Sequence, residues 1–199
     1  MATRMKSLKF FPVVTCILAL VLPASRALKG QGVPAQEGVN LDALIIQDFE
    51  NRVSEYAKLH KAIDAKMPAL KPTDSSEKIT QHQHELAEQI RKARQGAKQG
   101  DIFTPQIHAE FHRLIAIAMQ GQAAARISTS LRRAEPVRLR LQVNADYPAN
   151  VPLQSTPPSL LMNLPKLPEE IEYRVVGNSL VLCDAHANLI IDFMPGAIP

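Results

Sequence analysis

Cysteine is scarce in this 199-residue chain, and several catalytic signatures are absent from its sequence. Two cysteines cannot provide the disulfide framework of a chain this long. The sequence has no phosphate-cradling glycine loop and no Gly-x-Ser-x-Gly elbow, so no motif points to a nucleotide-binding protein or an α/β-hydrolase. Apolar residues make up 46% and charged residues 21%, which excludes collagen-like, purely coiled-coil and fully disordered chains.

The first 27 residues have the layout of a secretory signal peptide. Three basic residues and no acid precede the apolar run Phe10–Leu22, and the small residues Ser25 and Ala27 follow it at the −3 and −1 positions of a cleavage site. The run is shorter than the roughly 20 apolar residues of a membrane-spanning helix. We therefore expect cleavage after Ala27; the alternative is a lipoprotein acylated at Cys16.

Removal of this segment changes the charge argument. The chain carries a formal charge of +4, and residues 1–27 hold four basic residues and no acid, so the expected mature chain has 19 basic and 19 acidic residues. A neutral exported chain gives no electrostatic reason to expect a nucleic-acid partner. We expect a soluble periplasmic or extracellular protein with no transmembrane segment and with Cys183 as its one cysteine, either buried or paired between chains.

The sequence predicts an α+β fold with five segments: a signal peptide (1–27), a flexible lead (28–40), a helical region (41–135), an extended proline-rich segment (136–168) and a β-hairpin or meander (169–199). The helical region is expected to form a three- to four-helix bundle or hairpin. Its first helix, 41–67, carries apolar residues and one histidine at heptad spacing. These are Ile46, Phe49, Val53, Tyr56, His60, Ile63 and Met67.

Local signals predict where the remaining elements begin. Thr73 or Asp74 is expected to cap a second helix that runs to about Lys98 and lies antiparallel to the first. Thr104 and Pro105 open a third helix, as cap and first helical residue. Prolines then become frequent: residues 136–199 hold nine of them, which favours extended backbone in 136–168. The alternation over 137–143 is strand-like, and strands are expected over 171–176, 180–184 and 189–193.

His108 and His112 are the candidate metal ligands. They lie four residues apart on the third predicted helix, the spacing with which helices present two imidazoles to one ion. Glu110 lies two residues after His108, so the catalytic His-Glu-x-x-His order is not met. Further ligands from the second helix would complete a divalent transition-metal site; otherwise both rings line a partly exposed face and the protein has no cofactor. The candidates on that helix are His82, His84, Glu85 and Glu88.

Three other groups have competing explanations. Cys183, Asp184 and His186 share one turn and are either a nucleophile–base set or a buried thiol beside a turn-forming acid. His60 is either a satisfied core histidine or a pH sensor. The arginine-rich stretch 126–140 is either a solvated face or a surface for an acidic glycan, lipid headgroup or partner protein, and it lacks the interleaved aromatic residues that stack on nucleic acid.

The C-terminal segment resembles a family of uncharacterised secreted bacterial proteins. The likeness rests on Leu164-Pro165-x-Leu167-Pro168, Glu172-Tyr173-Arg174, Gly177, Leu180–Leu182, Asp184 and Ala187–Phe193 without position 191. The resemblance implies export and no assigned activity. The hairpin is also loosely similar to the tail of periplasmic nickel/cobalt homeostasis proteins, a likeness that transfers no ligand residue.

These features lead us to expect an exported protein of non-enzymatic binding function, with a protein or envelope component as partner. A periplasmic metal-binding protein that uses the helix histidines is the first alternative, and a hydrolase is the second. No catalytic residue is predicted.

Overall fold

The computed structural model describes residues 40–120, 124–127, 129, 140–147 and 156–198. Within them, helices α1 (Leu41–Asp64), α2 (Ser76–Ala93), α3 (Pro105–Ala118) and the short α5 (Pro158–Leu161) precede the strands β1 (Ile171–Val176), β2 (Ser179–Asp184) and β3 (Leu189–Met194). The strands form one antiparallel sheet in the order β1-β2-β3. Helices packed together and followed by a three-stranded meander confirm the predicted α+β class. Within the described residues no helix is long and apolar enough to cross a membrane.

Helix α1 begins where its sequence supplies a cap and buries the predicted stripe. Asn40 accepts a hydrogen bond from the backbone N–H of Ala43 through its side chain, which satisfies one of the free donors of the first turn. Phe49, Val53 and Tyr56 are buried in the main core. The helix ends at Asp64, three residues before the predicted end at residue 67.

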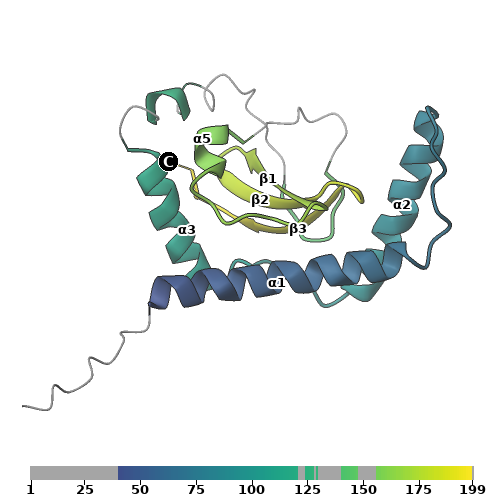
Figure 1. The fold of residues 1–199 in the computed structure, drawn as a ribbon, viewed down its shortest axis with the longest axis horizontal. Helices are drawn as coiled ribbons and strands as arrows, with labels where there is room; N and C mark the ends of the chain where they lie inside the picture. Colours follow the sequence, from purple (N-terminus) through teal and green to yellow (C-terminus); the bar gives the residue numbers. More distant parts are fainter. Residues whose placement is uncertain (1–39, 121–123, 128, 130–139, 148–155, 199) are drawn as a thin grey trace, which may run out of the picture. The chain divides into compact units, whose positions relative to one another are not determined.

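Helix α2 differs more from its prediction. It begins after Ser75, whose hydroxyl accepts from Lys78 N–H, and it ends at Ala93, five residues before the predicted end. Figure 1 shows the axis of α2 at a steep angle to the axis of α1. The two helices therefore do not form the side-by-side antiparallel hairpin expected from the sequence. Its second half buries Leu86 and Ile90, whereas Ile79 in the first half is 39% exposed.

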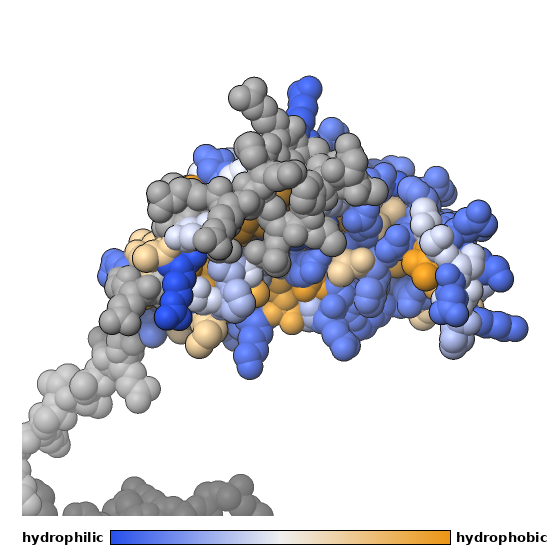
Figure 2. Space-filling model, turned by 90° about the horizontal axis from the view of Figure 1, so that it is seen from above, coloured by the Kyte–Doolittle hydropathy of each residue, from blue (hydrophilic) through white to orange (hydrophobic). Residues whose placement is uncertain are grey.

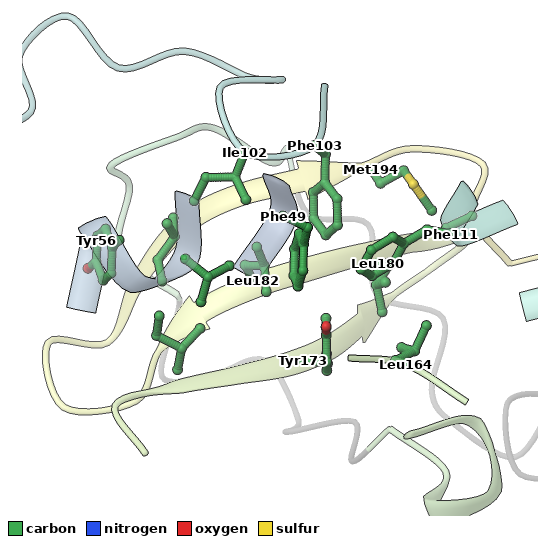
Figure 3. Packing of buried hydrophobic residues seen from close by; sticks show 14 of the residues in the cluster. Phe49, Tyr56, Ile102, Phe103, Phe111, Leu164, Tyr173, Leu180, Leu182 and Met194 are labelled. Atoms are coloured by element: carbon green, nitrogen blue, oxygen red, sulfur yellow. The ribbon is translucent and has the colours of Figure 1, made fainter. Parts of the chain in front are cut away.

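Helix α3 matches its prediction at the N-terminus. Thr104 caps it by accepting from the N–H of Ile107, and Pro105 is the first helical residue. Its buried face brings Phe111 against Phe49, with ring centroids 4.7 Å apart, and against Phe103 at 5.3 Å. Figure 3 shows these three rings between α1 and the sheet, where they form the centre of the core.

The sheet has one face toward the helices and a second buried face. Leu180 and Leu182 of β2 belong to the main core. Val181 and Cys183 point the other way, into a smaller cluster that includes Tyr147. A register shift opposite Leu182 and Cys183 interrupts the pairing of β2 with β3. Because side chains alternate along a strand, Cys183 lies in the smaller cluster, whereas its neighbour Asp184 lies on the face toward α1.

The proline-rich region only partly follows the prediction of extended backbone. Residues 158–161 form the short helix α5, which buries Leu160. The chain nearby is tied to β1, because Thr156 donates its hydroxyl to the carbonyl of Tyr173, whose own hydroxyl donates to the carbonyl of Pro165. Of the predicted strand over 137–143, residues 137–139 lie outside the described part of the chain, and residues 140–143 contain no strand.

Candidate functional site

Asp184, the last residue of β2, is a fully buried hydrogen-bond acceptor. Its Oδ2 accepts from the Tyr56 hydroxyl at 2.7 Å and lies 2.6 Å from Nδ1 of His60, both on α1. Its Oδ1 accepts from the backbone N–H groups of His186 and Ala187 at 2.9 and 2.7 Å, which forms the turn into β3. One carboxylate thus joins α1, β2 and the following turn.

The electrostatics of this network favour a charged pair. Burial alone would lower the pKa of His60, but the hydrogen bond and the charge of Asp184 outweigh it and raise that pKa. Burial would likewise raise the pKa of Asp184, yet the hydrogen bonds from His60 and Ala187 hold it below its ordinary value. The pKa of Tyr56 is raised by burial and by Asp184, so its hydroxyl remains a donor. Both shifts favour the imidazolium–carboxylate form of this buried pair.

A carboxylate that orients a histidine is also part of many catalytic sites. Here the His60 ring contacts that of His186, with centroids 5.6 Å apart, and no described hydrogen bond joins His60 directly to a hydroxyl or a thiol. The described contacts therefore indicate a structural role, in which Asp184 fastens α1 to the sheet through Tyr56 and His60. This agrees with the prediction of a satisfied core histidine.

Asp192 on β3 is a second buried carboxylate with a purely backbone set of donors. It accepts from the N–H groups of Gly100, Ile102 and Phe103 at 3.0, 2.8 and 2.9 Å. Gly100 has a φ of +89°, a conformation that glycine adopts without strain, and it allows the chain to curl around the carboxylate. Asp192 thereby fixes the loop that leads from α2 into α3.

Arginines hold the C-terminal end of α2. The Arg94 guanidinium lies over the Tyr56 ring, 5.0 Å from its centroid, and donates to Oδ1 of Asn144 at 2.9 Å. Asn144 donates back to the carbonyl of Arg94 at 2.8 Å. Arg91 donates to the carbonyl of Asn144 and pairs with Asp146. This end of α2 is anchored by polar contacts, in contrast to its exposed first half.

Cys183 is not arranged as a nucleophile with His186. Its side chain lies on the face of the sheet opposite to Asp184, fully buried with Val181 and Ile190. Burial raises the pKa of its thiol to about 12, so the reactive thiolate is scarce at neutral pH. His186 is exposed in the turn.

The burial of Cys183 predicts that its thiol reacts very slowly with thiol reagents in the folded chain. In a Cys16→Ser background, a thiol-reactive dye should label the folded chain at pH 8 at least about 100-fold more slowly than the chain in denaturant, because the thiol is both inaccessible and protonated. Labelling rates followed by absorbance measure this directly. Equal rates in the two states would show that Cys183 is accessible.

The predicted metal ligands His108 and His112 lie together on α3. Their ring centroids are 4.7 Å apart with a tilt of 58° between the planes, and both residues are partly buried. Burial and the neighbouring His108 lower the pKa of His112. Within the described residues neither ring has a hydrogen-bond partner or an ion-pair partner, so their nitrogens are not used by the fold.

The structure does not add the further ligands that the sequence offered from α2. Nε2 of His82 lies 3.5 Å from Oδ1 of Asp64 at the end of α1, and His84 is exposed. Across the described parts of the chain no group of three or more histidine, cysteine, aspartate or glutamate residues is arranged to hold a metal ion. A site on α3 would therefore consist of two protein ligands.

Three hollows of the surface adjoin α2. The largest of the three, of about 650 Å³, lies between the end of α1 and α2 and has Ile63, Met67 and Pro68 among its lining residues. Two others adjoin the link 65–75 and the first turns of α2. We call residues 65–89, the link and most of α2, the α2 arm. Figure 2 shows mainly hydrophilic side chains at this end of the molecule, with few hydrophobic ones among them.

The lining of the largest hollow combines apolar residues with charges of both signs. Lys66 and Lys92 are its basic residues, and Glu85 and Glu88 its acidic ones. None of the buried groups of the Asp184 and Asp192 networks lines any of the three hollows. The polar networks of the core and the open surface of the α2 arm are thus separate features.

Comparison with protein-family models, curated proteins and solved structures gives no match to this chain.

Proposed function

We propose that the chain is an exported, non-enzymatic binding protein that acts in the periplasm or outside the cell through its α2 arm. Export is supported by the basic, apolar and small-residue order of residues 1–27. The resemblance of the C-terminal segment to secreted bacterial proteins supports the same compartment.

The observation that carries the binding proposal is the hollow between α1 and α2. Apolar residues in a partly open groove, flanked by charges, are the usual make-up of a surface that receives a protein segment. The exposed first half of α2 adds to this, since Ile79 there is 39% exposed. The expected occupant is a segment of a partner protein with apolar anchors and charges of both signs, complementary to the basic residues Lys66 and Lys92 and to the acidic residues Glu85 and Glu88.

The buried polar groups of the core support a binding function over a catalytic one, because the fold itself already uses or encloses them. Asp184 and Asp192 have their oxygens occupied by donors of the fold, and Cys183 is buried with a raised pKa. A catalytic group needs access to substrate and an unfilled hydrogen bond or coordination position. We therefore assign these groups to fold stability and the interaction to the α2 arm.

Site-specific photocrosslinking in intact cells tests this proposal. A photoreactive amino acid at position 89, in the lining of the largest hollow, should give one discrete protein adduct. The same amino acid at position 116, exposed on α3, should give none. The Glu85→Lys, Glu88→Lys double variant should reduce the adduct at position 89 by about fivefold or more, because it reverses the charge of both acidic residues that line the hollow.

A matched variant keeps the test specific. The Glu50→Lys, Glu55→Lys double variant changes two exposed acids on α1 by the same total charge and should leave the adduct unchanged. The adduct partner, once purified, should bind the wild-type chain and not the Glu85→Lys, Glu88→Lys variant. Equal adducts from positions 89 and 116, or an adduct insensitive to the Glu85→Lys, Glu88→Lys variant, would contradict binding at the α2 arm.

A further inference from the structure

Six histidines occur in the chain, and all six are in the described residues. His60 is bound to Asp184, and His82 lies beside Asp64. His84 and His186 are exposed on separate elements. Only His108 and His112 form a pair on one helix face with their nitrogens unused by the fold. A pair of uncommitted imidazoles is therefore a distinct feature of α3, separate from the α2 arm.

The spacing of the two rings matches that of a chelate. A metal ion bound to two imidazoles at M–N distances of about 2.1 Å holds their centroids about 4.5 Å apart at a right angle and about 5.2 Å apart at the tetrahedral angle. The observed centroids are 4.7 Å apart. The 58° tilt differs from a face-to-face stack of the rings. The separation of the ring centroids is therefore compatible with one shared ion.

The surroundings also hold the pair in place. Ile107, Phe111 and Ile115 are buried on the adjoining face of α3, so the helix that carries the two histidines is fixed against the core. Partial burial restricts the rotamers of both rings, which lowers the entropy lost when an ion binds. The nearby cation, Arg113, is already paired with Glu110 and Asp42 and so adds little repulsion.

We propose that His108 and His112 form a two-histidine binding site for a divalent transition-metal ion of the imidazole-preferring class: Cu²⁺, Ni²⁺ or Zn²⁺. Two imidazoles supply two coordination positions, and water fills the others. Two protein ligands make a site of moderate affinity that exchanges its ion, and Cu²⁺ should bind more tightly than Ni²⁺ or Zn²⁺. This inference does not depend on the α2 arm.

Calorimetric titration of the untagged protein, purified as cells produce it, with CuCl₂, NiCl₂ and ZnCl₂ tests the proposal. We expect one ion per chain with a dissociation constant of about 1–100 μM, tightest for Cu²⁺. His108→Gln and His112→Gln should each weaken binding by about tenfold or more, and the double variant should abolish it. His186→Gln removes an exposed imidazole from the turn between β2 and β3 and should leave the affinity unchanged.

Two further measurements separate a metal site from a folding effect. Each variant is checked for unchanged far-ultraviolet circular dichroism and thermal midpoint in the absence of metal. The electron paramagnetic resonance spectrum of the Cu²⁺-loaded wild type should show nitrogen hyperfine splitting from two imidazoles, which the double variant should lose. The proposal is overturned if no ion binds more tightly than about 1 mM, or if the double variant binds like the wild type.

Discussion

Replacing Asp184 with asparagine should lower the free energy of unfolding by about 3–5 kcal/mol, because it leaves one partner of a buried ion pair uncompensated. The amide nitrogen would also face two donors, the hydroxyl of Tyr56 and the imidazolium of His60. Urea unfolding followed by circular dichroism measures the change. Asp146→Asn, which removes an exposed partner of Arg91, is the control and should cost less than about 1 kcal/mol. Similar losses in both variants would contradict a structural role specific to Asp184.

The same network predicts how stability depends on pH. The pKa of Asp184 is lowered in the fold, so its contribution is present above the unfolded value of about 4 and is lost as pH falls through the folded value. The pKa of His60 is raised, so its contribution is full below about pH 6.5 and declines as pH rises through the folded value. The difference in stability between wild type and His60→Gln should therefore shrink toward alkaline pH. A difference that grows with pH would contradict the ion pair.

Replacing Asp192 with alanine should lower the free energy of unfolding by about 3 kcal/mol or more, since it removes the acceptor of three backbone N–H groups in the loop between α2 and α3. Two of these donors, on Ile102 and Phe103, are buried and would not regain water as a partner while the fold persists. Asp101→Ala is the control, because Asp101 is exposed and accepts from a single backbone N–H, that of Lys98. Its expected cost is below about 1 kcal/mol.

Amide hydrogen exchange distinguishes this local effect from a general loss of stability. In Asp192→Ala, the N–H groups of Ile102 and Phe103 should exchange faster than those of β1, because the loop opens without global unfolding. Uniform acceleration across β1 and the loop, or a cost no larger than that of Asp101→Ala, would show that Asp192 does not fix the loop.

Local signals in the sequence predicted much of the fold. Thr104 and Pro105 placed the start of α3, and the predicted strands over 171–176 and 180–184 match β1 and β2, because caps and strand patterns depend on residues close together in the sequence. The stripe from Phe49 to Tyr56 predicted the buried face of α1 for the same reason.

The polar networks depend on partners far apart in the chain and could not be predicted from local pattern. Tyr56 and Asp184 are 128 residues apart in sequence, and Gly100 and Asp192 are 92 apart. The sequence did contain one signal of such a network, an acid within an apolar strand. Asp192 lies between Ile191 and Phe193, and a buried acid at such a position needs hydrogen-bond donors from the fold. The direction of α2 was also missed, because it is set by Arg94 and Asn144 and not by the short link.

The central claim is that an exported chain binds a partner through its α2 arm, and mass spectrometry of the species crosslinked at position 89 tests it most directly. Peptide mapping should find the chain beginning at Leu28 and joined to peptides of one partner protein at position 89. A chain that still begins at Met1, or a position 89 joined to no partner, would contradict the account.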